Sequence, residues 1–510
     1  MSRRSRCALI LISVAWVVLL LLKPSQGAPL WFDEGWSLVV ARTWATTGVY
    51  ARPLLGEPIS SVGMAQPPTA TLPVGLSFRW FGVGIWQGRL PGLLFTLGAV
   101  VLISLLAARC YDLSVAAVTL GVLLLMMPHG EIHPVLIGRQ ALAEMPMVFY
   151  LLAGYLCFGA SRRRPWLFLP SAAAYFGLAL TTKGHVLPFW LVSLVVPLCL
   201  AVAGRKWRLV VMVMLVMSGS LGAAQLVAAL RRHLEGDLFL YGAPMEGLYS
   251  VTALVLAPHV RLSSLATLFA VGQPTLFGIV YASLQLWKER RSLLTSLDLP
   301  AFLRLSLWTL TASWLTWYVM LSVGWPRYLF PPAVLGSVYV AALLLECLPG
   351  LDLREAVRHL ARALARRRMG GDALRAAVAL WLIALAVPLS VHLLRVTFSQ
   401  DPNSAVLRTT DYLNASAGRV DVIETYDSEL LFLLERPYHY PPDQVQVELN
   451  RRTFLGQDVE IPYDPLIADP DYLVVGRHSR MWGLYAPVTA AGEFELVATF
   501  DPYQVYRRVR

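Results

Sequence analysis

The chain has 510 residues, of which 56% are hydrophobic and 15% charged, and its formal net charge is +11. This composition predicts a polytopic membrane protein with room for one membrane domain and one modest soluble domain. It argues against nucleic-acid binding, because the lysines and arginines cluster in short segments between apolar runs. The five cysteines show no CxxC or Cys/His ligand spacing, so we expect neither a disulfide framework nor a zinc site.

Apolar runs long enough to cross a bilayer recur along the first part of the chain. The first run follows Arg3, Arg4 and Arg6 and resembles a signal peptide, but we interpret it as an uncleaved span because many spans follow it. On a criterion of ~20 residues per span we expect about eleven spans. They fall near residues 7–23, 91–108, 114–128, 146–160, 166–181, 186–203, 209–229, 263–287, 301–322, 331–348 and 375–397.

The basic residues predict the orientation of these spans. With a cytoplasmic N-terminus, the connections at 109, 162–164, 205–208, 288–291 and 354–375 all lie inside and are rich in arginine, as the positive-inside rule requires. The basic run at about 350–374 predicts a cytoplasmic amphipathic helix on anionic lipid. We therefore expect a multi-pass cell-membrane protein, with its longest loop, 24–90, on the external face.

Residues 398–510 differ from the rest in composition. Charge and proline rise, and alternating apolar stretches predict strands near 420–424, 472–476, 494–498 and 505–509, with a short helix at 428–434. The sequence thus predicts a transmembrane domain over 1–397, whose loop 24–90 carries interfacial helices, followed by a small external α/β domain over 398–510.

An acidic pair, Asp33 and Glu34, directly follows the first span. Carboxylates at a membrane boundary are costly unless they face water or a cation, so the pair is a candidate functional site. Trp36 and the apolar positions after it have helical spacing, which predicts an amphipathic helix along the membrane surface. Capping of that helix by the two carboxylates is the structural alternative.

The second external loop holds His129, Glu131 and His133, which together suggest a metal. Pro128 and Pro134 break any helical spacing, so a solvated loop is the favoured interpretation. We therefore assign no metal ligands, and the sequence neither requires nor excludes a divalent metal as cofactor.

Further charged side chains lie at the predicted external ends of spans. Glu144 precedes a span, with Arg139 nearby as a helix pair or a ligand contact; Lys183 and Arg327 each lie in a short external turn. Snorkelling is the structural alternative for the lysine, whereas Arg327 can bind two phosphate oxygens and Tyr328 can add a hydroxyl. External carboxylates (Asp33, Glu34, Glu144) and cations (Arg89, Lys183, Arg327) suit group transfer from a lipid-linked phosphate.

The order of these motifs resembles the membrane-embedded GT-C glycosyltransferases, in particular the aminoarabinose transferases and protein O-mannosyltransferases. The resemblance covers residues 1–397. It rests on Asp33-Glu34, Gln66-Pro67-Pro68, Phe81-Gly82 with Arg89-Leu90-Pro91, Arg139 with Glu144, Gly177–Gly184 and Arg327-Tyr328-Leu329-Phe330-Pro331.

This resemblance implies a polytopic α-helical GT-C fold and inverting transfer of a sugar from a polyprenyl phosphate at the external face. It implies Asp33 as the catalytic carboxylate beside Glu34, and Glu144 as a second acid. It places Lys183 and Arg327 near the donor phosphate. Arg89, Arg139 and Tyr328 are further candidates for binding the donor phosphate or lipid.

Two positions depart from the family pattern. Gln66 stands where relatives often carry a basic residue, and Trp36 and Ser37 stand where the aminoarabinose enzymes carry a basic and an aromatic residue. Gln66 and Trp36 are therefore expected near the acceptor or its loop, and neither lipid A nor aminoarabinose is assumed.

The acceptor is left as a lipid, protein or glycan of a cell envelope, with a prokaryotic source favoured and a monomeric enzyme expected. The alternative function is a transporter or flippase of a lipid-linked sugar. Transporters usually show internal repeats and mid-span charges, and we find neither in the sequence.

Overall fold

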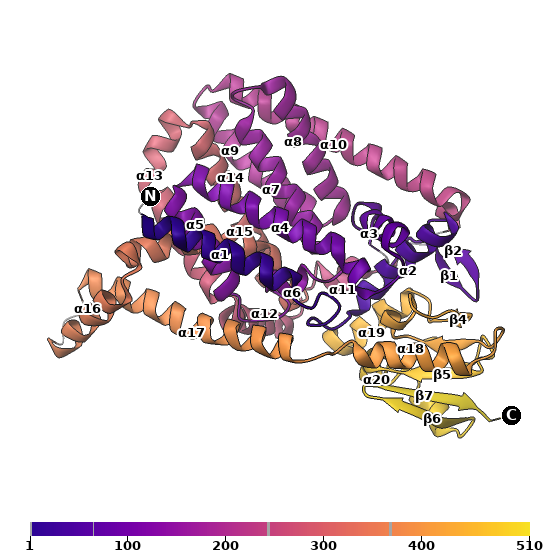
Figure 1. Cartoon of the computed structure of the whole chain (residues 1–510). Helices are drawn as coiled ribbons and strands as arrows, with labels where there is room; N and C mark the ends of the chain where they lie inside the picture. Colours follow the sequence, from indigo (N-terminus) through magenta and orange to yellow (C-terminus); the bar gives the residue numbers. More distant parts are fainter. Residues whose placement is uncertain (1–2, 65, 242–244, 367–369, 510) are drawn as a thin grey trace.

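The computed structural model describes residues 3–64, 66–241, 245–366 and 370–509. Figure 1 shows a helical body with the N-terminus and helix α16 (Leu353–Ala365) at one end and the C-terminal sheet at the other. Most of the body is built from apolar helices whose buried faces form one large core.

A helix covers each predicted span except one. Five helices of the described residues are long and apolar enough to cross a membrane, or up to six if a bent pair is one span. The membrane class is therefore confirmed, while the count of about eleven spans stays a prediction. The helices of the body are α1 (Arg3–Leu21), α4 (Ile85–Cys110), α5 (Leu113–Leu125), α7 (Glu144–Ala160), α8 (Pro165–Thr182), α9 (Val186–Ala203), α10 (Trp207–Glu235), α12 (Pro258–Val271), α13 (Gln273–Ser296), α14 (Leu299–Met320), α15 (Phe330–Cys347) and α17 (Gly371–Ser399).

The prediction of one continuous span at 263–287 is wrong. The chain forms α12 and α13 instead, which meet at 89°. Gly272 ends α12, and Pro274 lies in the first turn of α13. Proline lacks an N–H and restricts the residue before it, so it begins a new helix here rather than continuing the old one.

Short elements connect the body. The long first loop forms α2 (Phe32–Thr47), the hairpin β1 (Arg52–Leu54) and β2 (Glu57–Ile59), and α3 (Pro68–Phe81). The predicted helix after the acidic pair is thus confirmed. The other short helices are α6 (Pro134–Ile137), α11 (Leu248–Thr252), η1 (Gly236–Tyr241), η2 (Pro326–Leu329) and η3 (Pro349–Leu351).

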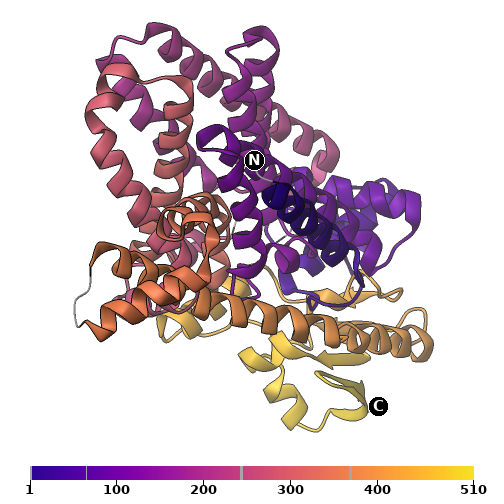
Figure 2. The same ribbon diagram turned by 60° about the vertical axis from the view of Figure 1, so that its left-hand side comes forward.

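The C-terminal region contains a five-stranded sheet in the order β4-β3-β5-β7-β6. β3 pairs in parallel with β4 and β5, whereas β7 runs antiparallel between β5 and β6. Figure 2 shows α17 leading into α18, which lies against the sheet. The elements are α18 (Ser404–Ser416), β3 (Ile423–Thr425), η4 (Ser428–Leu430), β4 (Tyr438–His439), α19 (Gln444–Leu455), β5 (Tyr472–Val475), α20 (Arg477–Trp482), α21 (Ala486–Ala490), β6 (Phe494–Phe500) and β7 (Tyr503–Arg508).

The four predicted strands are confirmed as β3, β5, β6 and β7. The helix predicted at 428–434 is wrong, since only the single 3-10 turn η4 forms there. Leu430, Leu431 and Phe432 are all fully buried and pack in one core with α2. A helix would place some of these consecutive side chains on another face, so packing on all sides favours a turn.

The first loop and the C-terminal region share one hydrophobic core. Trp36, Leu38 and Val40 of α2 belong to the same buried cluster as Leu430 and Val474 of the C-terminal region. Glycine at position 35 permits this packing, because a Cβ there would lie 2.4 Å from the carbonyl carbon of Ser428.

Helix α16 matches the predicted basic amphipathic helix at about 350–374, although residues 367–369 lie outside the described residues. Asp352 caps its N-terminus by accepting a hydrogen bond from the N–H of Glu355. Leu353, Val357 and Leu364 are exposed while the basic residues alternate with them. These exposed apolar side chains fit a helix that lies on a lipid surface.

Candidate active site

A cavity of about 260 Å³ lies between the helical body and the C-terminal domain. One wall is formed by α2, η2 and the loop before α6, and the other by α19 and α20. The lining residues are Trp31, Phe32, Asp33, Glu131, Trp325, Pro326, Arg327, Gln446, Asn450, Phe454, Arg477, His478, Met481 and Trp482.

Four charged side chains form a connected ion-pair network, which we call the cavity cluster: Asp33, Glu144, Lys183 and Arg327. Asp33 and Arg327 line the cavity, and Glu144 and Lys183 are joined to it through Arg327. Arg327 Nη2 lies 2.5 Å from Asp33 Oδ2, and its Nε lies 3.2 Å from Glu144 Oε1. The same Glu144 oxygen accepts a hydrogen bond of 2.5 Å from Lys183 Nζ. Residues 294 positions apart in the sequence are thus brought into one network.

Local structure places each member of the cluster. Asp33 lies in the first turn of α2 and Glu144 is the first residue of α7, and the positive end of a helix dipole stabilises a carboxylate at both places. Lys183 directly follows α8, and Arg327 lies in η2. Two helix starts and two short turns therefore meet at one point.

Two atoms of the cluster are buried without a partner. Arg327 Nη1 and Glu144 Oε2 have no hydrogen-bond partner among the described residues. Leaving a buried donor unpaired is costly. The unpaired Nη1 of a guanidinium whose residue lines a cavity suits a bound anion, in particular a phosphate oxygen.

Glu34 lies apart from the cavity cluster. Its carboxylate is fully buried and forms a two-bonded pair with Arg89, with Nε–Oε1 at 2.9 Å and Nη2–Oε2 at 3.0 Å. It also accepts from the N–H groups of Ala141 and Trp31. Four donors surround this carboxylate, and the bond from Trp31 is the capping interaction considered from the sequence.

Arg139 contacts the end of the first helix rather than Glu144. Its Nη2 donates to the carbonyl of Leu19 at 2.5 Å, and its Nη1 donates to the carbonyl of Lys23 at 2.9 Å. A guanidinium at these positions satisfies carbonyls that the C-terminus of α1 leaves free.

The remaining candidates differ in placement. Trp36 is 1% exposed, packs against Tyr440 of the C-terminal domain and is not among the residues that line the cavity, so its place near the acceptor stays a prediction. Gln66 is half-buried, two residues before the start of α3. Tyr328 lies beside the cluster with its ring 5.3 Å from that of Trp317 and 5.9 Å from that of His185.

Sequence reasoning missed residues that the C-terminal domain contributes to the cavity. His478 lies with its ring 5.1 Å from Phe32 and beside the carboxylates of Asp427 and Glu429. Burial opposes its protonation, but the two carboxylates outweigh burial and raise the pKa of His478 to about 10. No motif marks these residues, because they come together only through the parallel pairing of β3 and β5.

Two of the three residues that suggested a metal in the second loop, His133 and Glu131, have different surroundings. His133 is buried, where its Nδ1 accepts from the N–H of Val135 and its Nε2 lies 3.1 Å from the carbonyl of Leu124. Glu131 instead accepts a hydrogen bond from the backbone N–H of Arg327 at the cavity.

The basic loops predicted on the opposite face also lie together. Arg109 and Arg162–Arg164 line one cavity, and Arg162 also lines a second one with Arg205, Lys206 and Arg208. Separate connections thus meet on one side, as a shared membrane face requires.

No protein-family model matches the chain, and no curated protein sequence matches it. Solved structures do match. ArnT from Cupriavidus metallidurans bound to undecaprenyl phosphate has a TM-score of 0.61 at 16% identity, over 100% of this chain and 99% of that one. The oligosaccharyltransferase AglB from Archaeoglobus fulgidus, in complex with an inhibitory peptide and a dolichol-phosphate, has a TM-score of 0.54 at 10% identity, over 100% of this chain and 74% of that one.

ArnT is an aminoarabinose transferase, and both proteins are GT-C glycosyltransferases. At these identities the likeness concerns the fold, and it extends over the whole chain. The expectation drawn from the motif order is confirmed at this level: the chain has the polytopic membrane fold of the GT-C glycosyltransferases.

Proposed function

We propose that the protein is a glycosyltransferase that moves a sugar from a polyprenyl phosphate to an acceptor at the external membrane face. The observation that carries this proposal is the cavity cluster, in which two carboxylates and two cations from separate segments meet beside a cavity. The fold shared with ArnT and AglB supports it, because structures of those proteins contain undecaprenyl phosphate and dolichol-phosphate.

The donor phosphate binds to Arg327 and Lys183. The unpaired Nη1 of Arg327 offers a hydrogen bond to a phosphate oxygen. Lys183, which is held near Arg327 by their shared partner Glu144, adds a second positive charge. These cations stabilise the charge that develops on the departing phosphate, which is the main electrostatic demand of the reaction. The aromatic group of Tyr328, His185 and Trp317 provides an apolar wall for the first part of the lipid.

Asp33 is the general base. It removes the proton from the acceptor group as that group forms a bond to the anomeric carbon. The bond from this carbon to the phosphate oxygen breaks, and the polyprenyl phosphate leaves with the electron pair. Attack opposite the leaving group inverts the anomeric centre. In the structure Arg327 is paired with Asp33; a bound phosphate competes for this guanidinium and frees the carboxylate.

The other candidates position this machinery. Glu144 holds Lys183 and Arg327 at fixed places. Glu34 and Arg89 fix the start of α2, and Arg139 ties the end of α1 to the loop before α7. These contacts support a positioning role for all of them, in place of the catalytic role expected for Glu34 and Glu144.

The proposed transfer needs the cavity to open on the external face. The N-terminus and the basic loops are then cytoplasmic, and the domain over 398–510 lies outside and forms one wall of the site. The acceptor is a lipid, protein or glycan that enters between Asp33 and α20. We expect the chain to act as a monomer in the cell membrane.

Transfer from radiolabelled polyprenyl-phosphate sugars into membranes tests this function. Label should enter lipid, protein or glycan with the wild type but not with Asp33→Asn. Equal label with both, or none while lipid-linked sugar accumulates in one leaflet, would replace the proposal with the transporter alternative.

A further inference from the structure

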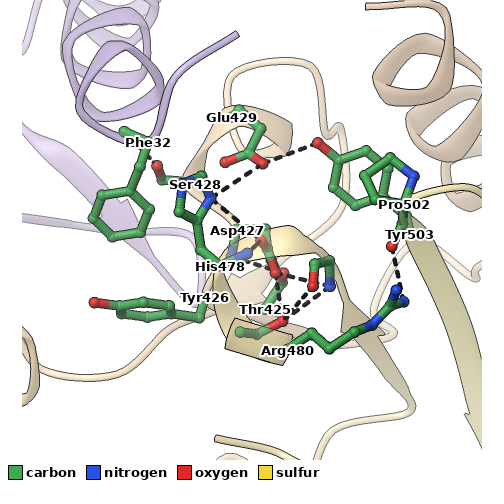
Figure 3. Close-up of polar contacts among 12 residues, drawn as sticks. Phe32, Thr425, Tyr426, Asp427, Ser428, Glu429, His478, Arg480, Pro502 and Tyr503 are labelled. Atoms are coloured by element: carbon green, nitrogen blue, oxygen red, sulfur yellow. Dashed lines mark hydrogen bonds and ion pairs between the residues drawn. The ribbon is translucent and has the colours of Figure 1, made fainter. Parts of the chain in front are cut away.

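A second group of charged residues lies on the wall of the cavity formed by the C-terminal domain. Asp427 and Glu429 flank Ser428 at η4, and His478 reaches them from the first turn of α20 (Figure 3). Asp427 is 0% and Glu429 2% exposed. Within the described parts of the chain these three form the one group of histidine, cysteine and carboxylate side chains placed to hold a metal ion.

The distances in this group are longer than hydrogen bonds. His478 Nδ1 lies 3.6 Å from Asp427 Oδ1 and 3.6 Å from Glu429 Oε1. An N–H···O bond normally spans about 2.7–3.2 Å. Two ligands of one tetrahedral ion at about 2.0–2.2 Å from it lie roughly 3.4 Å from each other. The observed spacing is therefore close to that of ligands around a shared ion.

The group also contains unused ligand atoms. Glu429 Oε2 and His478 Nδ1 are buried and have no hydrogen-bond partner among the described residues. The other Glu429 oxygen accepts a hydrogen bond from the hydroxyl of Tyr503 at 2.9 Å. A divalent ion would balance the charge of both buried carboxylates.

Asp427 is held in place before any ion binds. Its oxygens accept from the N–H of Gly476 at 2.9 Å, the N–H of His478 at 2.7 Å and the hydroxyl of Ser479 at 2.6 Å. Only glycine fits at 476, because a Cβ there would lie 2.5 Å from the carboxylate carbon of Asp427. Supporting hydrogen bonds of this kind orient metal ligands.

We propose that Asp427, Glu429 and His478 bind one divalent transition-metal ion, Zn²⁺ or Mn²⁺. One imidazole nitrogen and two carboxylates are a donor set that these ions accept. Three protein ligands leave a coordination position for water. His478 lines the cavity, so that water can come from the cavity.

The ion fixes the segment that positions α2. Ser428, between the two carboxylate ligands, donates a hydrogen bond of 2.5 Å to the carbonyl of Phe32. Phe32 directly precedes Asp33. Binding of the ion therefore orders the contact between the C-terminal domain and the start of the helix that carries Asp33, whatever reaction the cavity performs.

Metal binding to the purified full-length protein in detergent tests this site. After treatment with EDTA and its removal, ZnCl₂ or MnCl₂ is titrated by calorimetry and the metal content is measured by mass spectrometry. We expect one equivalent in the wild type and a higher Tm with metal than without. Glu429→Gln and His478→Gln should both lose that equivalent.

His439→Gln is the matched control. His439 also pairs with a buried glutamate of this sheet, but its Nδ1 lies 2.6 Å from Glu424 Oε2, which is an ordinary hydrogen bond. This variant should keep one equivalent of metal. A wild type that binds none would overturn the proposal, and so would unchanged binding in Glu429→Gln and His478→Gln.

X-ray absorption on the wild type remains decisive if the variants fail to fold. The spectrum should show one imidazole nitrogen with oxygen ligands, and a sulfur ligand or no imidazole would place the metal elsewhere. All these readouts are made without a sugar donor. Failure of the metal site and failure of the proposed transfer are therefore distinguishable.

Discussion

Two adjacent carboxylates begin the same helix and have different surroundings. Glu34 is fully buried, and Arg89 and two backbone N–H groups surround it. The side chain of Asp33 is 23% exposed, pairs with Arg327 and lines the cavity. Successive residues of an α-helix point about 100° apart. A pair that looks like one site in the sequence therefore divides into a structural ion pair and a reactive carboxylate.

These surroundings predict that substituting Glu34 and substituting Asp33 have different effects. A buried ion pair that loses one partner leaves an uncompensated charge, so its loss appears in stability. A carboxylate at a cavity makes fewer contacts with the protein, so its loss appears in activity. Four substitutions test this division, from the largest expected effect to the smallest.

Asp33→Asn should lower the rate of sugar transfer by about 10²–10⁴-fold, because the amide cannot accept the acceptor's proton. The thermal unfolding midpoint should stay close to that of the wild type. Transfer is measured with a labelled polyprenyl-phosphate sugar, and unfolding by differential scanning fluorimetry. Asp401→Asn, on the exposed connection before α18, is the control and should change neither value.

Glu34→Ala should lower the free energy of unfolding by about 3–5 kcal/mol, because Arg89 is left buried without its partner. Thermal unfolding in detergent measures this loss. The double variant Glu34→Met with Arg89→Met should recover most of it, since no charge then remains buried. A Glu34→Ala protein with wild-type stability and no transfer would instead give Glu34 a direct part in the reaction.

Lys183→Met should weaken transfer by roughly 10–100-fold through loss of a charged hydrogen bond worth about 1.5–3 kcal/mol. The loss should appear in KM for the donor, because the acceptor base is unchanged. Steady-state kinetics at several donor concentrations separate KM from kcat. A change confined to kcat would place Lys183 in the reaction step rather than in donor binding.

Ser428→Ala should have the smallest effect, about 1 kcal/mol of stability, because it removes one hydrogen bond to the carbonyl of Phe32. Thermal unfolding again measures it. A large fall in the rate of transfer with only this small loss of stability would show that the contact positions Asp33 for the reaction.

The helices of the body could be predicted because lipid imposes length and apolarity on a span. The break at Gly272–Pro274 could not be located from hydropathy, since apolar residues continue on both sides of it. The strands near Tyr472 and Phe494 could be predicted from the alternating apolar residues in those segments. Ser428–Leu434 was misjudged because an all-apolar segment has no period that separates a helix from a buried turn.

The candidate site was predicted only in part for a similar reason. The charge of Asp33, Lys183 and Arg327 at the ends of spans is enough to identify them as candidates. Their three ion pairs can be known only from the folded structure. Arg89 and Arg139 carry the same charge and were predicted at the same membrane face, yet Arg89 pairs with the buried Glu34 and Arg139 donates to backbone carbonyls, away from the cavity. Sequence position specifies the membrane depth of a charge but not the side of the helix on which its partner lies.

The core shared by α2 and the C-terminal domain has a consequence for biosynthesis. Phe32 and Ser428 are 396 residues apart, so at 5–20 residues per second a ribosome needs about 20–80 s to supply the second after the first. During that interval Trp36 and its apolar neighbours have left the ribosome without their final partner. The nascent first loop must be sheltered by lipid or by a chaperone, and a stop codon anywhere before the sheet leaves it permanently incomplete.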